Sequence, residues 1–167
     1  SDLIPLLAAV QAAEEARLKA SPPRGYQPIE GPAAYDQAVQ NLLFGAGSEI
    51  SQSGRVITVQ AIGGTGALKI GADYLKRLLP QAGLFISDPS WENHRALFET
   101  AGFKVENYPY YDPATRGVNF AAMKAFLAAL PAQSIVLLHA CCHNPTGADL
   151  SDEQWLEVAK LCRERAL

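Results

Sequence analysis

The stretch SIVLLHACCHNPTG, residues 134–147, decides the fold of this chain. Its apolar part, residues 135–138, predicts a buried strand, and two histidines, two cysteines and an Asn-Pro pair follow directly. Open α/β sheets bind their ligands at the carboxyl ends of such strands. Residues 139–147 are therefore expected to form a metal site, a nucleophile site or the floor of a cofactor pocket. The position of the stretch alone leaves these three open.

The sequence around this stretch alternates short apolar strands with amphipathic helices. Strands are expected at residues 56–59, 83–86, 104–108 and 135–138. Helices are expected at residues 2–19, 32–42, 68–79, 94–101 and 120–130, and from Ser151 onward, where Ser151 and Gln154 form a capping box. This alternation predicts an α/β fold in which a mainly parallel sheet is covered by helices on both faces.

The composition is that of a globular protein, with 49% hydrophobic and 19% charged residues among 167. A net charge of -3 with scattered lysines and arginines gives no basic surface for nucleic acid. No apolar run has the length that a membrane span requires. Three cysteines, two of them adjacent, argue against a disulfide framework. The expected compartment is therefore a reducing one, the cytoplasm.

A glycine-rich segment, Gly63-Gly64-Thr65-Gly66, lies between an expected strand and an expected helix. Glycines allow close approach of the backbone to an anion, and the first turn of a helix offers free N–H groups. The segment is therefore a candidate phosphate site, although its spacing is neither that of a Walker loop nor that of a dinucleotide fold. The alternative is a tight turn before a helix.

A second motif, Asp88-Pro89-Ser90-Trp91 with His94 one helical turn later, follows the next expected strand. An indole at such a position can stack on a planar ring. The alternative is that Trp91 is a core residue, as most aromatic side chains are.

The cysteines and histidines of the third motif do not have the spacing of a metal site. Structural zinc sites separate their ligand pairs, and adjacent strand residues such as Cys141 and Cys142 point to opposite faces. A Cys-His nucleophile would need an orienting group that the sequence does not identify. The two cysteines are therefore expected to be small buried residues, and no metal is expected. Asn144 can donate its amide into a pocket, with Pro145 setting the turn, which a cis bond would suit.

Together the three motifs resemble those of the aspartate and aromatic amino-acid aminotransferases, pyridoxal-phosphate enzymes of the type I aminotransferase fold. The matching segments are residues 63–68, 88–94 and 139–147, and Gly25-Tyr26 and Tyr110-Tyr111 extend the resemblance over essentially the whole chain. The resemblance implies part of the family's large domain. It also implies transfer of an amino group between an L-amino acid, aspartate or aromatic, and a 2-oxo acid.

The resemblance assigns cofactor contacts to four residues of the three motifs. Gly64 and Thr65 would bind the cofactor phosphate, and Trp91 would stack on the pyridine ring. Asn144 would donate a hydrogen bond to the phenolic oxygen of the ring. Trp91 and Asn144 would also contact the substrate.

The resemblance further implies three supporting residues. His94 would support the group that binds the ring nitrogen, with His139 nearby. Tyr26 would reach the phosphate bound in the other subunit of a homodimer.

The family's Schiff-base lysine has no counterpart on this chain. The resemblance places that lysine, the aspartate on the pyridine nitrogen and the substrate-binding arginines beyond Leu167. No lysine present has the matching context: Lys19, Lys69, Lys76, Lys104, Lys124 and Lys160. The chain therefore carries no catalytic residue and is expected to be an inactive fragment of a transaminase.

The expected organisation is an N-terminal part, residues 1–54, with helices and an interface loop, followed by the first part of the cofactor-binding domain, residues 55–167. Two alternatives remain. One is another fold-type I pyridoxal-phosphate enzyme, such as a lyase, and the other is an inert phosphate-binding fragment.

Overall fold

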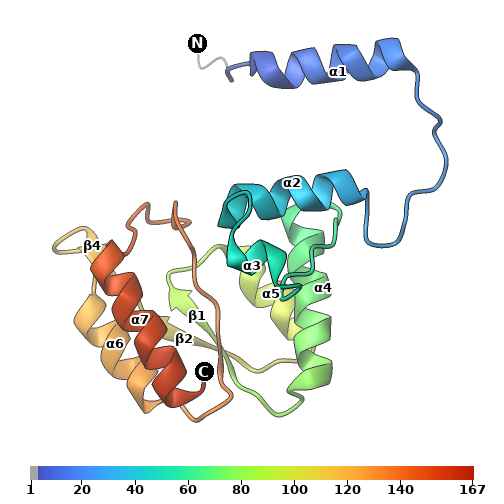
Figure 1. The fold of residues 1–167 in the computed structure, drawn as a ribbon. Helices are drawn as coiled ribbons and strands as arrows, with labels where there is room; N and C mark the ends of the chain where they lie inside the picture. The colour runs from blue at the N-terminus through green and yellow to red at the C-terminus, as the bar shows by residue number, and fades with distance from the viewer. Residues whose placement is uncertain (1–3) are drawn as a thin grey trace. The chain divides into compact units, whose positions relative to one another are not determined.

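The computed structural model describes residues 4–167, which form two compact units, residues 4–60 and 61–167. The first unit contains helices α1 (Ala8–Ala20), α2 (Ala33–Phe44) and α3 (Glu49–Gln52), shown in blue to teal in Figure 1. Helix α1 begins later than predicted, and residues 4–7 are not helical. Pro5 disfavours helical backbone at the preceding residue, Ile4. Asp2 and Leu3 lie outside the described residues.

The strand predicted at residues 56–59 is wrong, because residues 55–60 have no regular secondary structure. A strand needs a neighbour to bind its N–H and C=O groups. Within residues 4–167, every strand pairs elsewhere, in the sheets β2-β1-β5 and β3-β4. Ile57 and Val59 therefore remain exposed. The apolar pattern was present, but the described residues provide no partner strand for it.

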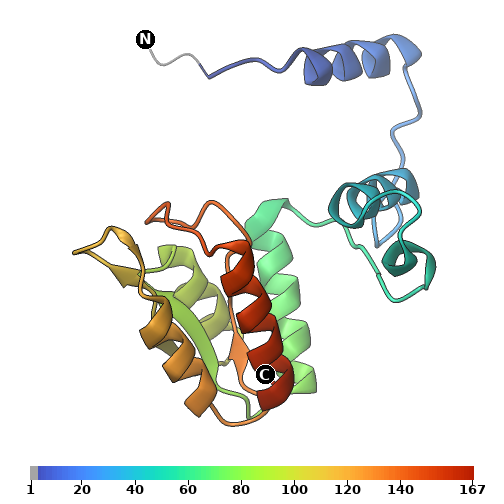
Figure 2. The same cartoon turned by 60° about the vertical axis from the view of Figure 1, so that its left-hand side comes forward.

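The second unit is built around a parallel sheet. Its elements are α4 (Gly63–Leu78), β1 (Leu84–Asp88), α5 (Glu92–Thr100), β2 (Val105–Pro109), β3 (Tyr111–Asp112), β4 (Gly117–Val118), α6 (Phe120–Ala129), β5 (Ile135–Val136) and α7 (Asp152–Arg165). The central strand β1 pairs in parallel with β2 and with β5. Figures 1 and 2 show α4 and α5 on one side of this sheet and α6 and α7 on the other. The predicted α/β fold is confirmed.

Alternate residues of β1 fill the two halves of the core. Leu84 and Ile86 pack with Phe98 of α5, while Phe85 packs on the other face with Leu127 of α6 and Val158 of α7. This alternation follows from the two-residue repeat of a strand. It explains why β1 is apolar on both sides and why both faces need a layer of helices.

Helix α7 begins with the predicted capping box. The Ser151 side chain accepts a hydrogen bond from the Gln154 N–H, and the Gln154 side chain accepts one from the Ser151 N–H. Val158 of this helix is buried, whereas the neighbouring Ala159 is exposed. The hairpin β3-β4 was not predicted, since strands of two residues leave no alternation to recognise.

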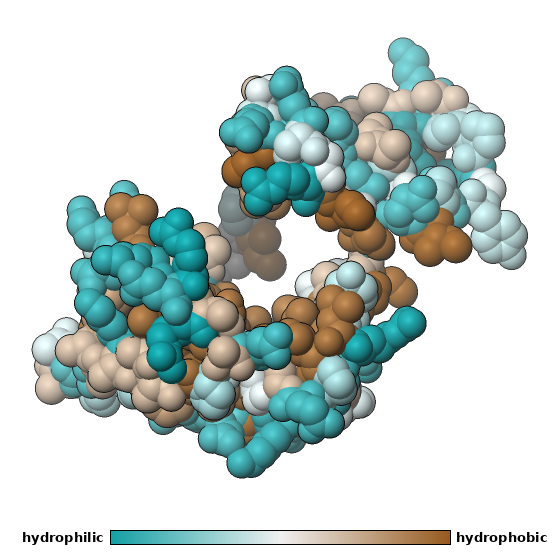
Figure 3. Space-filling model, turned by 60° about the horizontal axis from the view of Figure 1, so that its bottom comes forward, coloured by the Kyte–Doolittle hydropathy of each residue, from teal (hydrophilic) through white to brown (hydrophobic). Residues whose placement is uncertain are grey.

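Apolar side chains remain exposed on both units, as the brown patches of Figure 3 show. On α4, Ile70, Tyr74 and Leu78 are each more than half exposed and lie four residues apart, on one face of the helix. Ala72 of the same helix is fully buried in the core. Helix α4 therefore has apolar side chains on two faces, and only one of them is covered in this unit.

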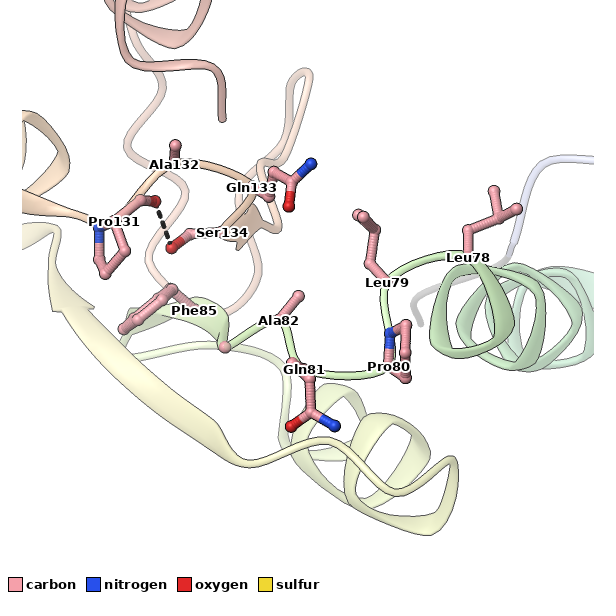
Figure 4. Close-up of a pocket in the computed structure, with 11 residues that line it drawn as sticks. Leu78, Leu79, Pro80, Gln81, Ala82, Phe85, Pro131, Ala132, Gln133 and Ser134 are labelled. Atoms are coloured by element: carbon pink, nitrogen blue, oxygen red, sulfur yellow. Dashed lines mark hydrogen bonds between the residues drawn. The ribbon is translucent and has the colours of Figure 1, made fainter.

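A hollow of about 470 Å³ opens at the amino ends of β1 and β5 (Figure 4). Its wall consists of Leu78 at the end of α4, the loop residues 79–83 before β1, Phe85 of β1, and residues 131–134 before β5. The Ser134 hydroxyl donates to the Pro131 carbonyl at 2.7 Å and so closes the second loop. The lining contains no acid, base or thiol side chain. This hollow lies at the opposite end of the strands from the three motifs.

Candidate functional site

Two of the three motifs meet where the parallel strands β1 and β5 end. The ring centroids of His94 and His139 are 5.0 Å apart, and those of His139 and His143 are 4.3 Å apart. The Trp91 indole lies edge-on to His94, with centroids 5.2 Å apart. These residues follow strands that are neighbours in the sheet, so the register of β1 with β5 brings them together. A cluster of aromatic and imidazole rings therefore covers the carboxyl edge of the sheet.

The Trp91 side chain is only half-buried and belongs to neither core cluster of the second unit. It lines a hollow of about 310 Å³ with the rest of its turn and with Asn107 of β2. His94, which contacts the Trp91 ring, is buried. Its Nδ1 is 2.9 Å from the Ser90 hydroxyl oxygen. Burial, followed by the neighbouring His139, lowers the pKa of His94. The alternative that Trp91 is a core aromatic is therefore not supported in this chain.

His143 joins the loop after β5 to the end of β1. Its Nε2 is 2.9 Å from the Ser87 hydroxyl oxygen, and its Nδ1 is 2.8 Å from that of Thr146. The ring stacks on Tyr110, with centroids 4.0 Å apart and planes within 16°. Burial, then the neighbouring His139, lowers the pKa of His143 to about 4. The imidazole is therefore neutral at pH 7. It packs between Ser87 at the end of β1 and Thr146 in the loop after β5.

We expect the His143 ring to remain neutral until the pH falls to about 4. In the unfolded chain the same ring titrates near pH 6.5 and takes up its proton first. Its contribution to stability is therefore complete above pH 6.5 and declines as the pH falls towards 4, by an amount on the order of 3 kcal/mol. NMR titration of labelled histidine rings measures this directly. A His143 signal with its midpoint near pH 6.5 would contradict the expectation.

The loop from His139 to Gly147 is held by its own backbone N–H groups. The Asp149 carboxylate accepts from the N–H groups of Cys142 and His143, at 2.8 Å each. The Asn144 N–H donates to Nδ1 of His139 at 3.3 Å. The bond between Asn144 and Pro145 is cis, and the Asn144 side chain is exposed beside the ring cluster.

The expectation that Cys141 and Cys142 are buried is wrong for this chain, since both are exposed. Residues 140–142 form a bend instead of continuing the strand, and Cys142 has a left-handed φ of 53°. The rule that adjacent strand residues face opposite sides therefore does not apply to them. Within residues 4–167, no group of three or more His, Cys, Asp or Glu side chains is placed to hold a metal ion.

The glycine motif forms the first turn of α4, which begins at Gly63. Within residues 4–167, the N–H groups of Gly64 and Thr65 have no hydrogen-bond acceptor, as expected for a first helical turn. The space in front of Gly64 is open to at least 4 Å. Thr65 lines a hollow of about 470 Å³ together with Asn93 of the second motif. The glycine motif therefore lies beside the helix that carries His94.

Tyr26 lies in the first unit and is fully exposed. Sequence reasoning missed Ser87, which is buried at the end of β1, and Asp149, which binds the loop backbone. For Tyr110, which stacks on His143, the only sequence signal is the family resemblance. A serine that follows three apolar strand residues was the available signal for Ser87, whereas nothing local distinguishes Asp149 from other loop acids. Among residues 4–167, no helix has the length and apolar composition to cross a membrane.

Comparison with known proteins identifies relatives along the whole chain. The family described as "Aminotransferase class I and II" matches residues 1–167. The aspartate aminotransferase of Pseudomonas aeruginosa is 66% identical over 162 residues, which cover 97% of this chain and 41% of that protein. The aromatic-amino-acid aminotransferase of Escherichia coli is 53% identical over 167 residues, covering 99% of this chain and 42% of that protein.

Solved structures give the same result. A crystal structure of the aromatic-amino-acid aminotransferase from Burkholderia pseudomallei, covalently bound to pyridoxal phosphate, matches with a TM-score of 0.95 and 60% identity. The match covers 98% of this chain and 41% of that one, so the chain spans about two-fifths of the length of the relatives it matches. Because the family pattern covers every residue and the relatives are far more than 30% identical, the chain belongs to the class I and II aminotransferases.

Proposed function

We propose that this chain is the part of a pyridoxal-phosphate-dependent transaminase that binds the phosphate, the ring face and the phenolic oxygen of the cofactor. The observation that carries the proposal is the buried Nε2 atom of His139, which has no hydrogen-bond partner within residues 4–167. A buried polar atom is rarely left unpaired unless a ligand or another segment supplies its partner. The His139 ring lies at the carboxyl edge of the sheet, next to the rings of His94 and His143.

The tautomer of His139 favours a hydrogen-bond acceptor as the partner of this atom. Its Nδ1 accepts the Asn144 N–H, so in the neutral ring the proton is on Nε2. Burial lowers the pKa of His139, with Asp149 opposing the effect, and the neutral form is therefore favoured at pH 7. The Nε2–H group is then a buried donor that needs an acceptor. The carboxylate that the resemblance places on the cofactor ring nitrogen, beyond Leu167, fits this need.

The remaining residues fit the other parts of the cofactor. The free N–H groups of Gly64 and Thr65 and the positive end of α4 suit a phosphate dianion. The half-exposed Trp91 indole offers a face on which the pyridine ring can stack. The exposed Asn144 amide can donate to the phenolic oxygen and to a substrate carboxylate. When bound, pyridoxal phosphate supplies the electron sink for the reaction.

The lysine that would hold the cofactor is assigned to a segment beyond this chain. Within the second unit, four lysines pair with carboxylates, and each pair is at least partly exposed: Lys69 with Asp73, Lys104 with Glu106, Lys124 with Glu157, and Lys160 with Glu164. Lys76 donates to the Pro80 carbonyl and lies over the Phe103 ring. These contacts direct all five ammonium groups to partners other than the ring cluster.

We further propose that the complete enzyme is a homodimer in the cytoplasm and that Tyr26 reaches the phosphate bound in the partner subunit. The exposed apolar stripe of α4 is a surface that additional polypeptide would cover. In this proposal residues 1–54 form the interface region and residues 55–167 the first part of the cofactor-binding domain. The substrates are an L-amino acid, aspartate or aromatic, and a 2-oxo acid.

The test uses the full-length enzyme, meaning a polypeptide that contains this chain and reaches the length of its relatives. It is supplied with pyridoxal phosphate, 2-oxoglutarate and either L-aspartate or L-phenylalanine, and glutamate formation is measured. Glutamate that appears in step with the new 2-oxo acid, and only with cofactor present, supports a transaminase. Release of ammonia without glutamate would support the lyase alternative, and no reaction with any pair would support the inert alternative.

A further inference from the structure

Asp149 lies outside the three motifs, yet its carboxylate binds the backbone of the loop that carries Asn144. One carboxylate oxygen accepts the Cys142 N–H and the other accepts the His143 N–H, both at 2.8 Å. Cys142 has a left-handed φ of 53°. Successive N–H groups around a residue in this conformation converge to form a binding site for an anion. Here the anion is a side chain of the same polypeptide.

We propose that Asp149 is a positioning residue, which fixes the backbone before Asn144 and thereby aims the Asn144 amide at the cofactor. The inference rests on the proposed role of Asn144. It adds a residue that contacts neither cofactor nor substrate and acts through the loop.

Asp149 is the charged residue that binds the backbone of this loop. The three successive N–H groups of Cys142, His143 and Asn144 all donate to side chains, the first two to Asp149 and the third to His139. Within residues 4–167, the Asn144 side chain itself makes no hydrogen bond. The position of its Cβ atom is therefore set by the backbone. A backbone held at three consecutive N–H groups fixes the point from which this side chain reaches the cofactor.

The charge of Asp149 is maintained by the same contacts. The His143 N–H, then the Cys142 N–H, hold the pKa of the Asp149 carboxyl below its usual value, so it is ionised at pH 7. A carboxylate offers acceptors to both donors, whereas an amide can offer only one oxygen. Replacing Asp149 by asparagine places an NH₂ group against one of the two N–H groups. The loop then loses one hydrogen bond, and the backbone N–H must move away from the NH₂ group, because both are donors.

The experiment measures two properties of the full-length enzyme loaded with pyridoxal phosphate. The first is the dissociation constant of the cofactor, and the second is the pH midpoint of the change in its absorbance band. Asn144→Ala removes the donor to the phenolic oxygen and is expected to move the midpoint. Asp149→Asn is expected to move it in the same direction, by a smaller amount, and to weaken cofactor binding about tenfold.

The double variant Asn144→Ala with Asp149→Asn separates a positioning role from a general structural one. If Asp149 acts through Asn144, the second substitution leaves the midpoint of Asn144→Ala unchanged. Asp112→Asn is the matched control, because Asp112 also binds a backbone N–H, that of Ala114, but in the β3-β4 turn. This control is expected to leave the midpoint and the dissociation constant at their original values.

If Asn144→Ala moves the midpoint and Asp149→Asn does not, or if their effects add, the positioning role is refuted while the proposed function stands. If Asn144→Ala itself has no effect, the proposed role of Asn144 is wrong and the positioning role falls with it. Should Asp149→Asn fail to fold, Asp149→Glu replaces it. This variant keeps the charge but displaces both oxygens, so a smaller shift in the same direction is expected and an unchanged midpoint refutes the positioning role.

Discussion

The isolated chain of 167 residues will show no transaminase turnover, even with pyridoxal phosphate, L-aspartate and 2-oxoglutarate in excess. None of its lysines has the sequence context of the family's Schiff-base lysine, and within the second unit the ammonium groups are engaged elsewhere. Without that group the reaction lacks both its covalent anchor and its proton carrier. We expect a rate about a millionfold below that of the full-length enzyme. Enzymes accelerate their reactions by about this factor or more over the uncatalysed reaction, and the acceleration requires a complete active site.

Glutamate formation, followed with a coupled assay, measures this rate. The control is the full-length enzyme at the same molar concentration, assayed with the same cofactor and substrates. Turnover by the isolated chain above the background of free pyridoxal phosphate would mean that a lysine within residues 1–167 takes the catalytic role. The assignment of that lysine to a segment beyond Leu167 would then be wrong.

Leu84→Ala will destabilise the full-length enzyme by about 3 kcal/mol, within the range of 2–5 kcal/mol for such a change in a packed core. Leu84 is fully buried in β1, where it pairs with Val105 of β2 and Ile135 of β5. It packs beside Phe98 on the face covered by α4 and α5. Its truncation leaves a cavity that neighbours on three elements cannot fill without moving. Unfolding in urea, followed by tryptophan fluorescence, measures the change.

Leu156→Ala is the matched control for this substitution. Leu156 lies on α7 and is 73% exposed among residues 4–167, so the same chemical change removes almost no packing against the described part of the chain. Its effect is expected to stay within about 0.5 kcal/mol. Equal destabilisation by the two variants would show that the free energy of unfolding does not depend on the β1 core as described.

The parts of the fold that are encoded locally were predictable from sequence. The strand β1 is a short continuous apolar run, the helices on either side have apolar residues at helical spacing, and the capping box of α7 is visible in four residues. The strand predicted at residues 56–59 shows the limit of this approach. Strand formation depends on a partner that is distant in sequence, so an apolar run predicts a strand only where such a partner exists.

The site was predictable to a similar extent. Two motifs that follow parallel strands must lie at the same edge of the sheet, and Trp91, His94 and His139 do meet there. The exposure of Cys141 and Cys142 was not predictable, because it depends on the left-handed backbone at Cys142. The contact of Asp149 with the loop depends on the same left-handed backbone and was not predictable either. No periodicity or motif encodes a side chain that binds the backbone six residues earlier.

The most direct test of the account is to locate the lysine that holds the cofactor. Full-length enzyme loaded with pyridoxal phosphate is reduced with borohydride, digested and mapped by mass spectrometry. We expect one adduct of cofactor mass, on a lysine beyond Leu167, and no adduct on the six lysines of this chain. An adduct on any of those six, or no adduct at all, would contradict the claim that residues 1–167 form a cofactor-binding site completed by a later segment.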